Sequence, residues 1–276
     1  MAEPIFMADS SDPGMQQAVK MARKTFRIFW RELSWEHRRI IPALDLACVK
    51  AAFTDTGDLV SADDVEQMWI NEVQFDGKKI TGTLVNQPNW LTSVAQGDSV
   101  TIKPSELMDW MYAVSGDVYG GLTVNHMRST MGRLGRRSHD SAWGLNFGDP
   151  KKIRFVPPEY IGETRPGFFA RMLGGGTTAQ DPAKVAATEH PMAVNMVESL
   201  KELAQNKENL TTTDDDGFTV LHQQCLAGAA RGVNVLLKCG ADGHAKTANG
   251  MTPFRLAKIL GWKSVLKVLE KHGITA

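Results

Sequence analysis

Apolar residues recur at helical spacing near the start of the chain. They form one stripe, and the basic side chains lie mostly on the opposite face. Asp12 and Pro13 precede the stripe, and this pair is typical of an N-cap followed by proline at the first helical position. The pattern predicts an amphipathic helix over about 13–33, with an apolar face that needs a flat surface to cover.

Short runs of strand-forming residues follow this helix, at 48–53, 67–75, 79–86, 99–103, 107–114 and 118–124. Turn residues separate the runs. The pair Asp76-Gly77 is a strong hairpin signal, because a tight two-residue turn favours positive φ. One helix followed by clustered strands predicts an α+β domain in which the helix packs on an antiparallel sheet.

Helical spacing returns over 125–135, and a basic stretch that we expect to be irregular follows it. This stretch contains Arg128, Arg133, Arg136, Arg137, Lys151, Lys152 and Arg154. Proline and glycine are then frequent, and the segment GGGTTAQDP is the best linker candidate. We therefore predict an α+β domain at 12–135, a basic, Pro/Gly-rich connecting segment at 136–181 and a third region at 182–276.

The third region contains an internal repeat with a period of 33 residues. The run GFTVLH at 217–222 returns as GMTPFR at 250–255, and the same offset relates Gly228 to Gly261 and Gly240 to Gly273. A degenerate earlier unit begins near His190-Pro191. This part resembles ankyrin repeats, about two and a half of them, and the resemblance implies an all-α array.

The ankyrin resemblance also implies protein binding through the concave face and the hairpin tips. The positions that we predict for these contacts are Asp216, Phe218, Gln223, Leu226, Asn249, Met251, Leu256 and Ile259. Val220 and Arg255 depart from the usual proline and histidine of the repeat. The alternative interpretation is that the array only stabilises the first domain as a cap.

Ordered short motifs in the first domain resemble a family as well. They include EQMWI at 66–70, GTLVNQP at 82–88, DWMY at 109–112 and GGLT at 120–123. Together they are similar to the YegJ-like bacterial domain of unknown function, over about 12–131. The resemblance implies no established reaction.

The same motifs supply a candidate ligand face, made of Trp69, Asn86, Asp109, Trp110, Gly120 and Gly121. Each of these residues also has a structural interpretation. The tryptophans are typical of a core, the glycine pair of a bulge or a close backbone approach, and Asp109 of a buried hydrogen-bond acceptor.

The composition of the chain limits the classes of partner that we expect. Lys+Arg and Asp+Glu both number 31, and this balance gives no general attraction to nucleic acid or to an anionic membrane. The three cysteines are widely spaced and form no metal motif, so we expect no metal, no cofactor and a reduced compartment. The start of the chain has no signal-peptide pattern, and we expect a cytoplasmic protein without a membrane segment.

Catalytic motifs are absent from the sequence, and we predict no catalytic residue. Asp109, His126 and His139 form an active site only if the fold brings them together. For the basic stretch we expect solvated or acid-paired side chains first, an acidic protein partner second and nucleic acid last.

Three functional hypotheses result. The first is a non-catalytic cytoplasmic protein–protein interaction module, with an immunity or antitoxin-like protein as its most specific form. The second is a small-molecule or peptide sensor that uses the Trp-rich α+β domain, and the third is an enzyme of an unrecognised class.

Overall fold

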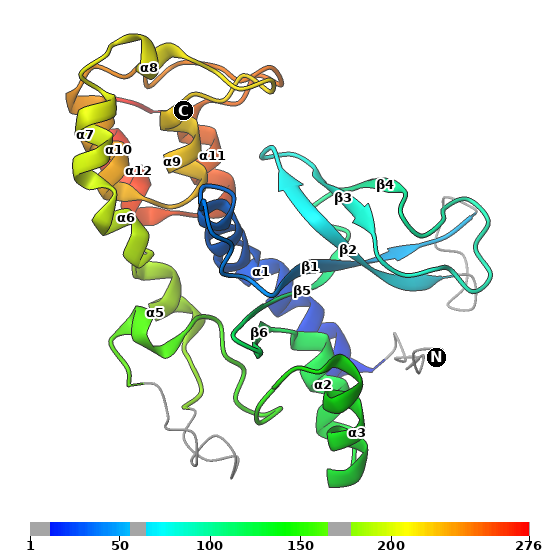
Figure 1. Ribbon diagram of the computed structural model, residues 1–276. Coiled ribbons are helices and arrows are strands. Elements are labelled where there is room, and N and C mark those ends of the chain that lie inside the picture. Colours follow the sequence, from blue (N-terminus) through cyan, green and yellow to red (C-terminus); the bar gives the residue numbers. More distant parts are fainter. Residues whose placement is uncertain (1–11, 56–64, 165–177, 276) are drawn as a thin grey trace. The chain divides into compact units, whose positions relative to one another are not determined.

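The computed structural model describes residues 12–55, 65–164 and 178–275 (Figure 1). Its contacts group the chain into two compact units. Unit 1 holds the described residues of Met1–Phe29, Ile41–Pro157 and Thr164–Gln180, and unit 2 holds those of Trp30–Ile40, Pro158–Glu163 and Asp181–Ala276. The limits drawn from the sequence, 12–135, 136–181 and 182–276, stay a prediction. The glycine run of the linker candidate, 174–176, lies outside the described residues.

Helix α1, Pro13–Glu36, begins where the sequence predicts and continues slightly beyond residue 33. The Asp12 carboxylate accepts a hydrogen bond from the Gly14 amide at 2.8 Å, which satisfies one of the free N–H groups of the first turn. Within this helix, residues up to Phe29 belong to unit 1, and residues from Trp30 to Glu36 belong to unit 2. One continuous helix therefore contributes side chains to two cores.

Six strands form the sheet of unit 1, with the order β4-β3-β2-β1-β5-β6 and antiparallel pairing throughout. They are β1 (Leu46–Phe53), β2 (Glu66–Phe75), β3 (Ile80–Leu84), β4 (Ser99–Ile102), β5 (Leu107–Val114) and β6 (Asp117–Gly120). Gly77 lies between β2 and β3 with φ 92°, as the Asp76-Gly77 signal predicts. The predicted α+β fold is confirmed.

Helix α1 covers one face of this sheet with its unit 1 residues. The rings of Phe29 and Trp110 lie 5.8 Å apart, and those of Phe26 and Phe75 lie 5.4 Å apart with their planes nearly perpendicular. The Trp110 indole donates a hydrogen bond to the Ala22 carbonyl at 3.0 Å. The apolar stripe of the helix thus finds the flat surface that it requires.

The opposite face of the sheet packs against α2 (Leu122–Thr130) and the segment around α3 (Arg133–Trp143). Successive side chains of a strand point to opposite faces, so Met111 lies on the other side from Trp110. Met111 belongs to a second core cluster with Trp69, Val124 and Phe147. Unit 1 is therefore a sheet with helical cover on both faces.

Two expectations about this part of the chain were wrong. Residues 122–124 begin α2 instead of ending a strand, because Gly121 adopts a left-handed conformation (φ 61°, ψ 48°) that turns the chain after β6. The stretch after Gly135 is irregular only from Gly144 onward, since α3 continues to Trp143. Further along, Phe155 and Val156 are buried, and both of their amides donate to the Gln180 side chain.

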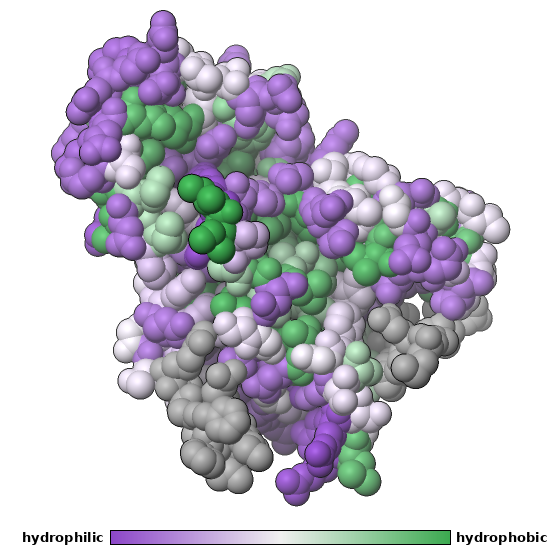
Figure 2. All heavy atoms as spheres, in the orientation of Figure 1, coloured by the Kyte–Doolittle hydropathy of each residue, from purple (hydrophilic) through white to green (hydrophobic). Residues whose placement is uncertain are grey.

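Unit 2 contains a short 3₁₀ helix, η2 (Pro158–Ile161), and a series of α-helices. These are α5 (Pro182–Ala187), α6 (Pro191–Asn195), α7 (Val197–Leu203), α8 (Glu208–Thr211), α9 (Val220–Leu226), α10 (Ala230–Lys238), α11 (Pro253–Leu260) and α12 (Lys263–Lys271). On the face seen in Figure 2, hydrophilic atoms gather over α7 and α8.

The 33-residue offset corresponds to equivalent structure. Thr219 caps α9 and Thr252 caps α11, each with its side-chain oxygen accepting from a backbone amide. Gly228 has φ 70°, and a Cβ atom there would approach the Trp262 ring to 2.7 Å, so this turn requires glycine for two reasons. The predicted helical ankyrin array is confirmed.

The end of α1 packs into the same unit. Trp35 is 1% exposed and joins a cluster with Ala193, Ala227 and Ala229. Its ring stacks on that of His190 with 5.6 Å between centroids. A single ankyrin repeat cannot bury its own apolar faces, so the array needs such cover at its ends. A helix from the beginning of the chain supplies part of it.

Candidate functional site

Asp109, from the candidate ligand face, is fully buried beneath the start of α2. Its carboxylate accepts hydrogen bonds from the amides of Leu122 and Thr123, at 2.9 and 2.8 Å, and from the Thr123 hydroxyl. These are the N–H groups that a helix leaves free in its first turn, and a negative charge there is stabilised by the helix dipole. Asp109 is the anchor of α2.

Trp110, Gly120 and Gly121 are also structural. Trp110 is fully buried and bonded to α1 as described above. A Cβ atom on Gly120 would lie 2.4 Å from the Trp110 carbonyl oxygen, and Gly120 has φ 80°. The glycine pair thus serves the close approach of β6 to β5 and the turn into α2.

Trp69 and Asn86 complete that set. The Asn86 side-chain oxygen accepts from the Trp69 amide at 3.0 Å, and the Trp69 ring packs edge-on against Trp143 at 6.2 Å. Lys50 lies over the Trp69 ring at 5.4 Å from its centroid. Because Trp69 is only 9% exposed, little of its ring is available to a ligand.

Asp109, His126 and His139 each have separate partners. The Nε2 atom of His126 bonds to Asp12, and the Nδ1 atom of His139 lies 3.0 Å from the Asp140 carboxylate. No hydrogen bond or ion pair of the described residues joins the three. The geometry therefore supplies no catalytic arrangement of these groups.

The predicted ankyrin contacts divide by exposure. Four belong to the buried part of the array: Phe218, Leu226, Met251 and Leu256. Gln223 and Asn249 are partly buried, and Asp216 and Ile259 are exposed. Asn249 accepts a hydrogen bond from the Thr247 hydroxyl at 2.7 Å, within its own loop. Of the predicted set, Asp216 and Ile259 offer the most surface to a partner.

The hairpin tips of the array are held by a backbone bond and a side-chain contact between successive repeats. The Ala248 amide donates to the Asp216 carbonyl at 2.9 Å, and the His222 Nε2 atom lies 3.0 Å from the Ala245 carbonyl. Burial lowers the pKa of His222, which favours the neutral ring that accepts from the Thr219 amide. The backbone is fixed, while the side chains of Asp215 and Asp216 remain exposed.

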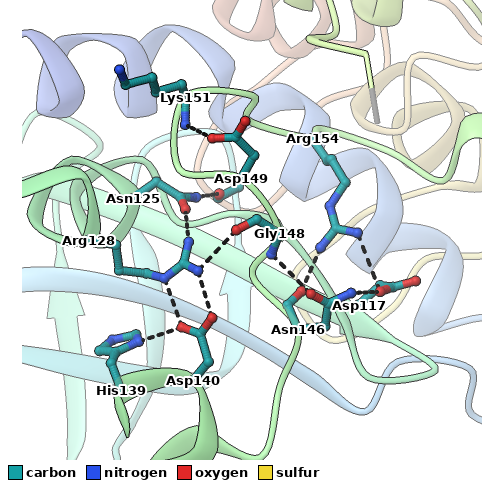
Figure 3. A network of polar contacts seen from close by, with 11 residues as sticks. Asp117, Asn125, Arg128, His139, Asp140, Asn146, Gly148, Asp149, Lys151 and Arg154 are labelled. Carbon is teal, nitrogen blue, oxygen red and sulfur yellow. Dashed lines mark hydrogen bonds and ion pairs between the residues drawn. The ribbon is translucent and has the colours of Figure 1, made fainter. Parts of the chain in front are cut away.

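A polar network in unit 1 organises the basic stretch (Figure 3). Arg128 is 2% exposed, and its guanidinium donates two hydrogen bonds to the Asp140 carboxylate, at 2.8 and 2.6 Å. It also donates to the Asn125 side chain at 2.7 Å and to the Gly148 carbonyl at 3.0 Å. Burial alone would raise the pKa of Asp140, but hydrogen bonds from His139 and Arg128 outweigh this effect and lower it.

Arg154 forms the second part of this network. It lies 3.3 Å from the Asp117 carboxylate, donates to the Asn146 carbonyl at 2.6 Å and covers the Tyr119 ring. Arg128 and Arg154 are therefore acid-paired, which is one of the two states, solvated or acid-paired, that we expected first for this stretch.

The remaining arginines of the stretch differ. Arg133, Arg136 and Arg137 lie on α3 and line an open hollow of about 870 Å³, whose other lining residues include Arg128 and Asp140. Among the described residues, no side-chain hydrogen bond or ion pair involves these three guanidinium groups. Three positive charges are thus left on one surface.

A buried charge cluster in unit 2 was missed by sequence reasoning. Glu32 is 5% exposed and lies 3.0 Å from Arg31 and 3.1 Å from the His190 Nε2 atom. Arg31 also donates to the carbonyls of Val185 and Thr188, at the end of α5, at 3.0 and 2.6 Å. The available signal was a charged Arg-Glu pair that lies between Trp30 and Leu33, two residues of the apolar stripe of the first helix.

Comparison with known proteins identifies relatives of both parts of the chain. Residues 12–147 match the family described as "Uncharacterized protein conserved in bacteria (DUF2314)". A protein of Neisseria meningitidis serogroup B, described as "Putative ankyrin repeat protein", is 38% identical over 267 residues, which cover 96% of each chain. The chain belongs to the same family as this ankyrin repeat protein. It combines a DUF2314 domain with C-terminal ankyrin repeats.

The "Uncharacterized protein YegJ" of Escherichia coli strain K12 is a more distant relative. It is 29% identical over 116 residues, which cover 42% of this chain and 68% of YegJ. The YegJ-like resemblance drawn from the sequence motifs is therefore confirmed. Among the described residues, no helix has the length and apolar character needed to cross a bilayer, and no group of three or more possible metal ligands occurs.

Proposed function

We propose that this protein is a protein-binding module that holds its partner on the ankyrin-repeat unit. The observation that carries the proposal is the state of the hairpin tips. The tips are held by the backbone bond from Ala248 to Asp216 and by the contact of the His222 side chain with the Ala245 carbonyl, and the side chains of Asp215 and Asp216 are exposed. Rigidly presented side chains lose little conformational entropy when a partner binds, which favours affinity.

The binding surface that we propose comprises the acidic tip and the exposed side of α11. Ile259 is 50% exposed on that helix, and Arg255 and Lys258 are exposed beside it. An apolar side chain surrounded by charged ones is the usual composition of a contact centre with a polar rim. The buried members of the predicted set would act only by supporting this surface.

Affinity capture from a bacterial lysate, read by mass spectrometry, tests the proposal. Two full-length variants are compared with the natural chain: Asp215→Lys with Asp216→Lys and Ile259→Asp on the proposed surface, and Lys263→Glu with Lys267→Glu on the outer helix α12. We expect a partner that the first variant loses and the control retains. A partner that both variants retain equally would place the contact elsewhere and refute the proposed surface.

Full-length variants are preferable to a truncation near Gly176. A chain without the repeats would leave Trp35 without Ala193, Ala227 and Ala229, against which it packs. Loss of a partner could then reflect a damaged α1 instead of a missing surface.

The most specific form of the proposal is an immunity or antitoxin-like protein in the cytoplasm. It is motivated by the pairing of a compact domain with a repeat surface and by the lack of catalytic motifs in the sequence. Neutralisation of a toxin encoded beside this chain would support it. If the chain neither bound nor neutralised such a toxin, this form would be abandoned, while the general binding proposal would stand on the capture result.

A further inference from the structure

The start of α3 carries a concentration of positive charge that the fold does not use. Arg133, Arg136 and Arg137 lie in its first two turns, at the edge of the hollow described above. The only acidic residue of that helix is Asp140, and Arg128 and His139 already hold its carboxylate. The three arginines, which we call the arginine rim, therefore have no counter-charge on their own helix.

This position is unfavourable for the helix itself. The N-terminal end of a helix carries partial positive charge, so cations there are repelled and anions are attracted. The first turn of α3 has no acidic residue, and its N-cap, Gly132, offers no side chain to accept a hydrogen bond. Local features that destabilise the fold, with no stabilising contact to compensate, are expected at functional sites. An anion bound at the arginine rim would remove the conflict.

The surface beneath the rim is rigid. His139 packs on Phe147 with 5.1 Å between ring centroids, and Trp143 packs on Phe147 at 6.2 Å. The buried Arg128–Asp140 pair ties α3 to α2. A site built on fixed elements positions its ligand-binding groups before the ligand arrives.

An apolar side chain lies within the rim. Leu134 is 83% exposed, directly after Arg133. In Figure 2, strongly hydrophilic atoms gather over α3 with hydrophobic atoms beside them. A ligand that fits both features carries negative charge and an apolar group on one short stretch.

We propose that the arginine rim binds an acidic segment of another protein, with carboxylates on the guanidinium groups and an apolar side chain on Leu134. Arginine presents two parallel N–H groups that match the two oxygens of a carboxylate. The proposal concerns unit 1 alone and does not depend on the ankyrin surface.

Two other anionic partners fit less well. A helix that lies on a membrane needs a broad apolar face toward the lipid, whereas α3 directs His139 and Trp143 into its own unit. Proteins that bind single-stranded nucleic acid pair basic groups with aromatic faces on which bases stack. The aromatic rings next to this rim, Trp143 and Phe147, are packed against each other and their neighbours.

The test measures binding of labelled peptides to the full chain by fluorescence anisotropy. Two peptides of equal length and equal negative charge are used: one contains glutamate and serine, and the other has leucine in place of some of the serines. We expect both to bind, more weakly as salt rises, and the leucine peptide to bind more tightly. The variant Arg133→Glu with Arg136→Glu and Arg137→Glu should lose at least about tenfold in affinity for both peptides.

Three further variants make the result specific. Lys78→Glu with Lys79→Glu and Lys103→Glu changes the net charge of unit 1 by the same amount at exposed positions and should change binding little. Arg-to-Lys exchange at all three rim positions keeps the charge and should weaken binding, because lysine cannot form the paired contact. Leu134→Ser should lower the affinity for the leucine peptide by about tenfold at most and leave the affinity for the serine peptide unchanged.

The proposal is overturned if neither peptide binds, or if the lysine control loses as much affinity as the rim variant. It is also overturned if phosphatidylglycerol vesicles or a single-stranded oligonucleotide bind at the rim and the peptides do not. Circular dichroism of each variant checks that the fold is retained, and the Arg-to-Lys variant keeps the test valid if the charge reversal unfolds α3.

Discussion

Each unit buries a carboxylate, and the partners that stabilise the two carboxylates differ. In unit 1, the hydrogen-bond donors to Asp109 are uncharged: the first amides of α2, the Thr123 hydroxyl and the amide of Trp110. In unit 2, Glu32 is held by two ionisable side chains, Arg31 and His190. The hydrogen bonds to Asp109 come from neutral groups, whereas the Glu32 arrangement includes the ion pair with Arg31 and so also depends on the charges of these two side chains.

The largest effect is expected at Asp109. Asp109→Ala leaves several buried amides at the start of α2 without an acceptor, and we expect a loss of about 3–5 kcal/mol in the free energy of unfolding. Asp76→Ala is the matched control, because Asp76 also accepts from two amides but does so in an exposed turn. Its loss should be about 1 kcal/mol.

Urea denaturation followed by hydrogen exchange measures this difference and locates it. Faster exchange in α2 is expected for Asp109→Ala alone. Equal losses for the two variants would show that burial of the Asp109 carboxylate adds nothing to its capping role.

Glu32→Gln should have the next largest effect. It leaves the buried Arg31 without its charge partner, and breaking such a pair costs about 3 kcal/mol. Glu198→Gln on α7 is the control, because the Glu198–Lys201 pair is exposed and should contribute nothing measurable. Denaturation monitored by circular dichroism would compare the two variants, and unchanged stability of Glu32→Gln would show that the ion pair with Arg31 does not stabilise unit 2.

Acidic pH should lower the stability of unit 2 through protonation of Glu32. Burial alone would raise the pKa of Glu32, but Arg31 and His190 outweigh it and hold the pKa below the ordinary value of 4.5. A carboxyl with a lowered pKa in the folded state contributes its full stability above the unfolded value. This contribution is lost as the pH falls below about 4.5 through the folded value.

Thermal unfolding of the natural chain and of Glu32→Gln between pH 7 and pH 3 tests this directly. The difference between the two chains should shrink as the pH falls below about 4.5. A difference that stays constant over this range would mean that Glu32 does not titrate with folding.

The smallest effect concerns the uncharged caps within unit 2. Thr219 is 6% exposed, and its hydroxyl contacts the buried His222 ring at 2.8 Å, whereas the equivalent Thr252 faces the exposed Arg255. We expect Thr219→Ala to cost about 1–2 kcal/mol and Thr252→Ala about 1 kcal/mol. Calorimetry of both variants would rank them, and equal losses would show that the contact with His222 adds nothing to the cap bond.

Sequence patterns predicted the elements that depend on local signals. Period-2 and period-3.6 spacing located the strands and α1, and the 33-residue offset located α9 to α12. The start of α2 was placed wrongly because its cap, Asp109, is 13 residues away from Leu122 along the chain. No local pattern marks a capping residue on a neighbouring strand.

The charge cluster of unit 2 was unpredictable for a similar reason. Arg31 bonds to Val185 and Thr188, which are more than 150 residues further along the chain. The candidate ligand face shows the opposite difficulty, because buried structural residues such as Asp109 and Trp110 have the same types as ligand-binding ones. Residue type and spacing alone do not distinguish a side chain that holds the fold from one that holds a ligand.

The division of α1 between two units has a consequence for synthesis on the ribosome. Its second half, with Trp35, emerges early, but its packing partners at Ala193, Ala227 and Ala229 follow more than 150 residues later. At roughly 5–20 residues per second, that interval is on the order of ten seconds. During this time an apolar helix segment is available to chaperones, and its packing in unit 2 can be completed only after residue 229 has been synthesised.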